Sequence, residues 1–207
     1  MNYDLKMQEM MENITDGERL LLHACCAPCT SGCLEHIANK FKISILFYNP
    51  NITEEVEYLK RLDELKRFVS EFKVKYPIEV IDGEYDPKIF FELSKGLEDE
   101  PERGKRCYKC YEERIKETAK IAESLGIKYF TTTLSLSPHK NADWVNEIGE
   151  RLDKDYNTNF LYCDFKKREG YKRSIELSKE YNLYRQDYCG CIYSKRDSLK
   201  RKEDKNN

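Results

Sequence analysis

Five short apolar runs alternate with longer amphipathic segments along this chain, and this alternation is what most constrains its fold. Turn-forming residues bound each run, as expected for buried strands. Between the runs, apolar side chains recur at helical spacing, as they do over residues 58–72, after the expected N-cap residue Thr53. The predicted strands are Leu20–Ala24, Ile43–Tyr48, Ile78–Ile81, Tyr129–Leu134 and Phe160–Cys163. The alternation predicts an α/β domain with a mostly parallel sheet and helices on both faces.

The length and composition favour one globular domain. The chain has 207 residues, of which 40% are apolar, and this is enough for a core. No apolar run approaches the ~18 residues of a membrane span, and the first nineteen residues are polar and acidic, unlike a signal peptide. We therefore expect a cytoplasmic protein with no membrane partner. It would comprise a helical polar leader (1–19), a main domain (20–197) and a polar tail (198–207).

Nine cysteines give the strongest chemical signal, because structural disulfides are rare in the cytoplasm. Metal binding or redox catalysis is therefore the expected use of these thiols. Cys25 and Cys26 directly follow the first predicted strand, and Cys107 and Cys110 form a CxxC motif at a predicted helix start. There the helix dipole and nearby basic residues favour thiolates. Those basic residues are Arg103, Lys105, Arg106 and Lys109. Together the two pairs supply four thiolates, which suit a [4Fe–4S] cluster or a structural zinc ion.

Three further cysteines have different expected places. Cys29 lies close enough to the first pair to be an additional ligand, for instance to a second metal. Cys33 follows one helical turn later and is expected in the core. Cys163 ends a predicted strand beside Asp164, and we expect it to be buried as well.

The Cys189-Gly190-Cys191 segment indicates a different use for its two cysteines. Cysteines two residues apart close only a small ring, which the intervening glycine lets the backbone form. Such a disulfide is strained and easily reduced, and this favours redox use over structural stapling. A metal-binding pair and two free thiols stay open as alternatives.

Several common sites are missing from the sequence. It contains neither a GxGxxG motif after the first strand nor a GxxxxGK[ST] loop, and no HExxH motif. A double cysteine stands where ATP pyrophosphatases carry a serine–glycine–glycine loop that binds pyrophosphate. The pattern resembles a nucleotide-hydrolase or HUP-like scaffold whose phosphate loop is replaced by thiols. Ligands bind such sheets beyond the carboxyl ends of the strands, so Cys25, residues 48–51, residues 137–140 and Asp164 should converge there.

Charge is distributed unevenly along the chain. Residues 166–202 contain twelve Lys or Arg and five Asp or Glu, a balance of +7, although the whole chain carries −2. The rest of the chain therefore carries −9. This basic segment suits a polyanionic partner bound on one side of the protein, although a solvated helical face would look the same.

Taken together, the motifs resemble those of the cobalamin-independent epoxyqueuosine reductases of the QueH type. The matching segments run in the family's order from about residue 20 to 197. They are HACCAPC (23–29), FYNPNI (47–52), EYLKR (57–61), RCYKCYEERI (106–115), TTTLSLSPHKN (131–141), DFKKREGYKRS (164–174) and YRQDYCGCIYS (184–194).

The resemblance implies an oxidoreductase in the last step of queuosine formation, which reduces the epoxide of epoxyqueuosine at the tRNA wobble position. It further implies a [4Fe–4S] cluster held by two cysteine pairs, a redox-active disulfide, and a second iron near the cluster. The cluster ligands would be Cys25, Cys26, Cys107 and Cys110, and the disulfide would join Cys189 to Cys191. Cys29, where some relatives carry an aspartate, would serve the second iron.

The chemistry of the reaction assigns further expected roles. Removing the epoxide oxygen as water takes two electrons and two protons, and one dithiol holds two electrons. His139 or Asp164 could donate a proton to the leaving oxygen. Tyr48 or Tyr171 could stack on an anticodon base. Phosphate contacts are expected from Lys166, Lys167, Arg168, Lys172 and Arg173.

The sequence names no electron donor and no oligomeric state. Two other functions stay open: a tRNA- or protein-binding module organised by a four-cysteine zinc site, and a protein thiol–disulfide oxidoreductase. The first predicts a colourless zinc protein without a redox response. The second predicts activity without any metal.

Overall fold

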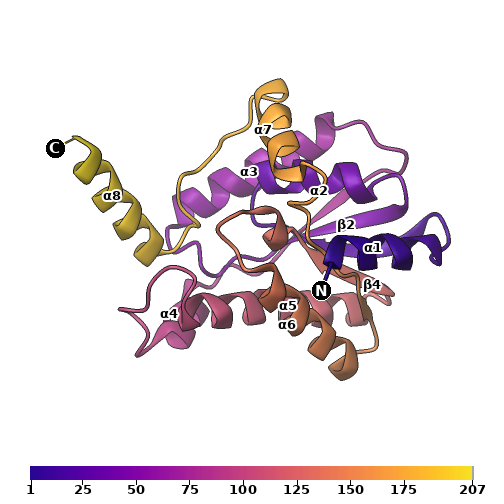
Figure 1. The fold of residues 1–207 in the computed structure, drawn as a ribbon, viewed down its shortest axis with the longest axis horizontal. Helices are drawn as coiled ribbons and strands as arrows, with labels where there is room; N and C mark the ends of the chain where they lie inside the picture. Colours follow the sequence, from indigo (N-terminus) through magenta and orange to yellow (C-terminus); the bar gives the residue numbers. More distant parts are fainter. Residues whose placement is uncertain (207) are drawn as a thin grey trace.

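All five strands lie in one parallel sheet, in the order β3-β2-β1-β4-β5, which confirms the predicted α/β class (Figure 1). The structure, a computed structural model, describes residues 1–206. The strands are β1 (Glu18–His23), β2 (Phe41–Phe47), β3 (Glu79–Asp82), β4 (Tyr129–Thr132) and β5 (Asn159–Phe160). The apolar side chains of β1 and β2 are almost entirely buried, as expected for strands covered on both faces.

Helices cover both faces of the sheet (Figure 1). On one face α2 packs against α3 and α7, and on the other α5 packs against α6 and contacts β1 and β4. The helices are α1 (Tyr3–Glu12), α2 (Ala27–Ile37), α3 (Glu55–Glu71), α4 (Pro87–Ser94), α5 (Lys105–Ser124), α6 (Ala142–Asp155), α7 (Gly170–Glu180) and α8 (Ile192–Asn206). Within residues 1–206, no helix is both long and apolar enough to cross a membrane.

The strand order places a crevice at the carboxyl edge of the sheet. Successive crossovers run outward from β1 to one side and from β4 to the other, so the chain segments after these two neighbouring strands diverge. Ligands of open α/β sheets bind at such a point. The residues that follow β1 and β4 are therefore the first candidates for a site.

Two predicted strands are shorter in the structure, for local reasons. The strand predicted over Tyr129–Leu134 ends at Thr132, whose side chain accepts a hydrogen bond from the Leu134 N–H and begins the short 3₁₀ helix η1 (Thr133–Leu136). The strand predicted to reach Cys163 ends at Phe160. From there the Asn146 side chain bonds both the N–H and the carbonyl of Cys163, in place of a neighbouring strand.

Two helix boundaries also differ from the predictions. Thr53 is not the N-cap of α3; the helix begins after Glu54, whose side chain makes no capping bond. Beyond Cys191 the chain forms α8, which projects away from the rest of the fold toward the C-terminus (Figure 1). The sequence favoured only a polar tail there, because α8 lacks a continuous apolar stripe for a core.

Candidate active site

A cavity of about 550 Å³ lies at the carboxyl edge of the sheet, where the sequence predicted the site. Segments after β1 and β4, the start of α5 and the chain before α8 line it. Seven of the nine cysteines contribute to the lining: Cys25, Cys26, Cys29, Cys107, Cys110, Cys189 and Cys191. The fold thus gathers three sequence-distant thiol groups around one space.

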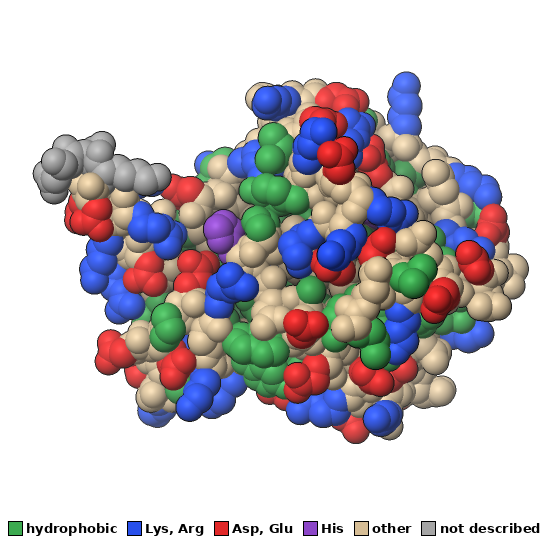
Figure 2. All heavy atoms as spheres, viewed as in Figure 1, with side chains coloured by type: hydrophobic (Ala, Val, Ile, Leu, Met, Phe, Trp, Pro, Cys, Tyr) green, Lys and Arg blue, Asp and Glu red, His purple; other side chains and the backbone are tan. Residues whose placement is uncertain are grey.

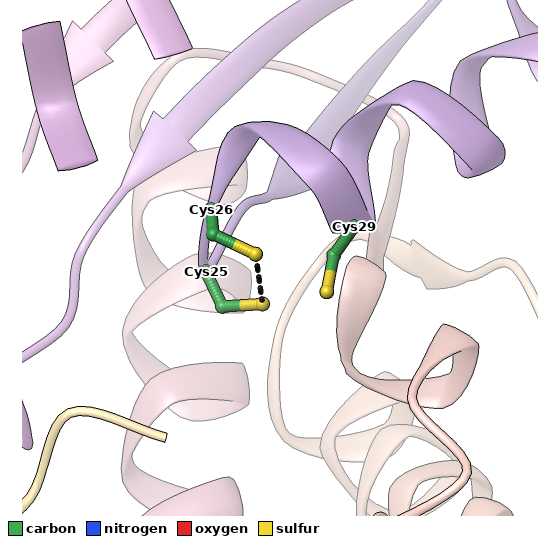
Figure 3. Close-up of side chains that lie close together, drawn as sticks. All are labelled: Cys25, Cys26 and Cys29. Carbon is green, nitrogen blue, oxygen red and sulfur yellow. Dashed lines mark hydrogen bonds between the residues drawn. The ribbon is translucent and has the colours of Figure 1, made fainter. Parts of the chain in front are cut away.

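The first group is a triad formed by Cys25, Cys26 and Cys29 (Figure 3). Their sulfur atoms all lie within 4.8 Å of one another, and the Sγ atoms of Cys25 and Cys26 are 3.8 Å apart. The turn from β1 into α2 creates this arrangement, with Cys26 at the N-cap position and Pro28 in the first turn. Thr133, just after β4, accepts a hydrogen bond from the Cys25 N–H at 3.3 Å. The triad therefore sits on the junction between β1 and β4.

Within the triad, Cys25 is the thiol best suited to lose its proton. Hydrogen bonds from Cys26 and then Cys29 hold the pKa of the Cys25 thiol well below its usual value. Donating these bonds makes the other two thiols harder to deprotonate. The pKa of Cys26 rises to about 11, and that of Cys29 rises well above its usual value. Three soft sulfur donors at this spacing can hold a metal.

The second group is the CxxC pair, Cys107 and Cys110, in the first turns of α5. Burial raises the pKa of Cys107 and brings that of Cys110 to about 11, so the expected stabilisation of both thiolates is wrong. Arg106, whose guanidinium donates to the carbonyls of Leu97 and Glu98 at 2.7 and 3.0 Å, lowers the pKa of Cys107 by less than burial raises it. Desolvation therefore outweighs the helix dipole at this pair.

The third group is Cys189 and Cys191, present as free thiols with their Sγ atoms 3.5 Å apart. Gly190 between them has φ +114°, and a Cβ there would lie 2.7 Å from the Ile52 side chain. Only glycine fits this turn without strain. The Ser194 hydroxyl lies 3.0 Å from the Cys189 sulfur and 3.4 Å from the Cys191 sulfur. The pair is therefore held side by side at the start of α8.

The two thiols of this pair also differ in acidity. A hydrogen bond from Cys191 holds the pKa of Cys189 well below its usual value, and the pKa of Cys191 is raised in return. The Cys189 carbonyl accepts hydrogen bonds from Asn51 and Arg61, both at 3.2 Å. These bonds fix the turn against the loop that follows β2 and against α3. A dithiol with one acidic sulfur suits thiol–disulfide chemistry.

Three cations that line the cavity are Arg61, Arg114 and Lys140; the sequence placed Lys140 at the site with residues 137–140 but missed Arg61 and Arg114. Arg61 and Arg114 are each 2% exposed, which is unusual for charged side chains. Burial lowers the pKa of Lys140, but the thiols of Cys25 and Cys29 outweigh this effect and raise it overall. The only sequence signal was position, since each cation lies in a segment that the family resemblance had matched. Their charges make the cavity suitable for an anionic centre.

The two predicted proton donors lie in different places. His139 is exposed and lines the cavity. Asp164 is absent from the lining, and its carboxylate pairs with the Lys166 ammonium at 2.8 Å. The structure therefore brings His139, and not Asp164, to the thiols.

The remaining predicted residues also separate into two groups. Tyr171 lines the cavity, whereas Tyr48 is buried outside it and its hydroxyl donates to Glu113 at 2.9 Å. Cys33 and Cys163 are fully buried outside the lining, which confirms their predicted burial.

Most of the basic side chains that were expected to contact phosphates form ion pairs with acidic side chains of the protein. Arg168 pairs with Asp4, and Arg173 pairs with Glu35 and Glu176. Lys166 and Lys172 are paired in the same way. Of the five residues expected to contact phosphates, only Lys167 has no ion pair among the described side chains. Figure 2 accordingly shows blue and red side chains interspersed over this face of the molecule.

Comparison with known proteins agrees with the site. The model of the family described as epoxyqueuosine reductase QueH matches residues 20–197. The chain is 42% identical to the epoxyqueuosine reductase QueH of Staphylococcus epidermidis over 93% of this chain and 84% of the relative. It is 41% identical to that of Streptococcus pyogenes, over 93% and 78%. A more distant relative, from Thermotoga maritima, is 34% identical over 84% of this chain and 89% of its own length.

Proposed function

The chain belongs to the epoxyqueuosine reductase QueH family, and from this premise we propose that it reduces epoxyqueuosine in tRNA to queuosine. The observation that carries the proposal beyond the family match is the convergence of seven thiols on one cavity. A protein-binding module has no need of so many redox-capable groups at one place. A cytoplasmic location, as expected from the sequence, is part of the proposal.

Oxidation of the Cys189 and Cys191 thiols would supply the number of electrons and protons that reduction of the epoxide consumes. Conversion of the epoxide to an alkene breaks two carbon–oxygen bonds, consumes two electrons and two protons, and releases water. Oxidation of two thiols to one disulfide releases two electrons and two protons. One dithiol therefore balances one epoxide, and an external donor must reduce the disulfide before the next turnover.

We propose that Cys25, Cys26, Cys107 and Cys110 hold a [4Fe–4S] cluster. The donor set fits this group: four thiols line one cavity whose walls also carry buried cations, and a cluster with four thiolates is anionic. When bound, the cluster would pass electrons singly and offer iron as a Lewis acid. Cys29, the third member of the triad, is the proposed ligand of a second iron.

The spacing of the sulfurs favours a cluster over a single zinc ion at these four cysteines. Zn–S bonds of about 2.3 Å require the sulfurs of a tetrahedral site to lie within about 4 Å of one another. Among the described residues, only Cys25, Cys26 and Cys29 form a group of three ligands near this spacing, and the CxxC pair is not part of the group. A multi-iron cluster is larger and suits ligands that stand further apart.

The other lining residues have roles in binding and proton transfer. His139, exposed at the cavity, is the proposed proton donor to the leaving oxygen, and Tyr171 is positioned to stack on a base. Asp164 stays a proposed donor only if its pair with Lys166 opens. The tRNA would be held through phosphates by basic side chains around the cavity.

The experiment that tests this function is conversion of the modified nucleoside. Anaerobic protein, loaded with iron and sulfide, is incubated with tRNA containing epoxyqueuosine and a chemical reductant, and the nucleosides are identified by mass spectrometry. We expect queuosine to form with wild type and with Cys33→Ala, whose cysteine is buried outside the cavity. Absence of queuosine in every preparation that contains iron would contradict the function.

A further inference from the structure

Arg114 of α5 is a buried cation without a carboxylate partner. It is 2% exposed, and its Nη2 donates to the Asn49 Oδ1 at 2.6 Å. Its Nε lies 3.4 Å from the His23 Nε2, and its Nη1 lies 3.9 Å from the Cys110 sulfur. Among the described side chains, no carboxylate lies within ion-pair distance of this guanidinium. Neither of these partners, the Asn49 amide and the His23 imidazole, can supply a negative charge.

A guanidinium in this position needs an anion nearby. Removing a charge from water costs several kcal/mol unless an opposite charge compensates it. The equally buried Arg61 shows the ordinary solution, a salt bridge to Glu57 at 2.7 Å. Arg114 has no such carboxylate, and the group beside it that can become negative is the Cys110 thiol, 3.9 Å from its Nη1. The compensating negative charge is therefore expected on the sulfur atoms of the cavity.

The contacts of Arg114 also connect α5, which carries Cys107 and Cys110, to the turn that carries Cys25 and Cys26. Cys110 lies one helical turn before Arg114 on α5, on the same side of the helix. Asn49, which accepts a hydrogen bond from Arg114, donates in turn from its Nδ2 to the carbonyl of Ala24 at 2.9 Å. Ala24 is the residue directly before Cys25. One guanidinium thus fixes the distance between the CxxC helix and the turn that carries the triad.

We propose that Arg114 is the positioning residue and the fixed positive counter-charge of the thiol site, an inference that rests on the proposed function. Four thiols that bind a [4Fe–4S]²⁺ core lose their protons and would form a complex of net charge −2, which a fixed cation favours. The same cation favours addition of an electron to an iron–sulfur cluster, whose reduction potential depends on nearby charge. Arg114 acts through Cys110 and the Cys25 turn and need not touch the substrate.

The test compares four proteins: wild type, Arg114→Met, Arg114→Lys and Lys116→Met. The last variant removes an exposed cation from the same helix and serves as the matched control. The first measurement titrates metal-free protein with Co²⁺ and follows the sulfur-to-cobalt charge-transfer absorption. Loss of a supporting contact of this kind weakens metal affinity by about 10–100-fold, and we expect this loss in Arg114→Met. Arg114→Lys should recover part of it, and Lys116→Met should match wild type.

The second measurement is the reduction potential of the iron–sulfur cluster. We expect a more negative potential in Arg114→Met and one close to wild type in Arg114→Lys, which retains the charge. A purely structural arginine would not give this difference between methionine and lysine. A folded Arg114→Met variant with wild-type Co²⁺ affinity would overturn the proposal.

Two other outcomes are also informative. If Arg114→Met does not fold, Arg114→Lys decides alone: affinity within about tenfold of wild type supports the counter-charge, and a loss near 100-fold overturns it. If wild type forms no iron–sulfur cluster, the proposed cofactor fails, and the Co²⁺ affinities still test Arg114.

Discussion

Each cysteine of the cavity has its own surroundings, and these decide what its replacement should do. Cys110 is buried beside Arg114, and Cys107 accepts a hydrogen bond from the Arg103 N–H at 3.3 Å. Replacing either by Ala removes one of four proposed cluster ligands. We expect the iron content of anaerobically purified protein to fall below half, as measured by iron and sulfide analysis, with Cys33→Ala as the control. Full iron in both variants would refute the ligand assignment.

Cys189→Ser should have a different effect, because this sulfur belongs to the proposed dithiol. The four cluster ligands stay intact, so iron content should equal that of wild type. A serine hydroxyl forms no disulfide, so repeated turnover should stop. The measured quantity is the number of queuosines formed per protein molecule when the pre-reduced variant, or the pre-reduced wild type, is given an excess of tRNA. Iron loss in proportion to activity would instead assign Cys189 and Cys191 to a metal site.

Residue type alone does not reveal the buried cations. Two cysteine pairs could be placed from the sequence because Cys25 and Cys26 follow a predicted strand and Cys107 and Cys110 open a predicted helix. Arg61 and Arg114 lie on helices rich in charged side chains, and most of those side chains are exposed or half-buried. Only the folded chain brings their charges to the sulfurs. The same limit explains why the pKa direction at Cys107 and Cys110 was predicted wrongly, since burial could not be judged from neighbouring residues.

The loop from β2 to α3 and the turn before α8 act together as one element of the site. Ile52 from the first segment packs against Gly190 of the second, and Thr53 donates its N–H to the Gly190 carbonyl at 3.3 Å. Gly190→Ala would place a methyl group against Ile52 at an unfavourable φ, costing about 1–3 kcal/mol. We expect the variant to keep its iron and to lose most multiple-turnover activity.

A matched control for this turn is Gly96→Ala. Gly96 also has positive φ, but nothing lies within 4 Å of the added Cβ, so the strain is present without the collision. Activity and iron content should then stay near wild type, with a slightly lower melting temperature. Equal loss of activity in both variants would show that backbone strain, and not the contact with Ile52, explains the Gly190→Ala result.

The elements that form the core were predictable, whereas some of their ends and the C-terminal helix were not. The strands β1 and β2 and the parallel arrangement follow from apolar runs separated by helical periodicity. The end of the fifth predicted strand could not be foreseen, because the Asn146 side chain replaces strand pairing there. Helix α8 was missed because it forms with few buried side chains, and binary patterning detects only helices that cover a core.

Binding of tRNA depends on the charge of the whole surface. Affinity should fall steeply with salt, because each phosphate contact releases counterions. Reversing Lys166, Lys167 and Arg168 together should weaken binding and flatten the salt dependence by about 0.7–0.9 units of slope per lost contact. Filter binding over a range of salt concentrations measures both quantities.

The ion pairs of this segment require a control. Arg168 holds Asp4 of α1, so its reversal also breaks a salt bridge between the leader and the α7 segment. Lys167→Glu alone leaves every ion pair of the segment in place and should account for most of the change. If the triple variant binds tRNA as wild type does at all salt concentrations, the segment is only a solvated face.

The central claim is that this fold assembles distant thiols into an iron–sulfur site for epoxide reduction. An anaerobic visible and EPR spectrum, with iron and sulfide analysis of the same sample, tests it most directly. The account predicts a brown protein with at least four irons and four sulfides per chain, and an EPR signal that changes on reduction. A colourless protein with stoichiometric zinc and no redox response would contradict it.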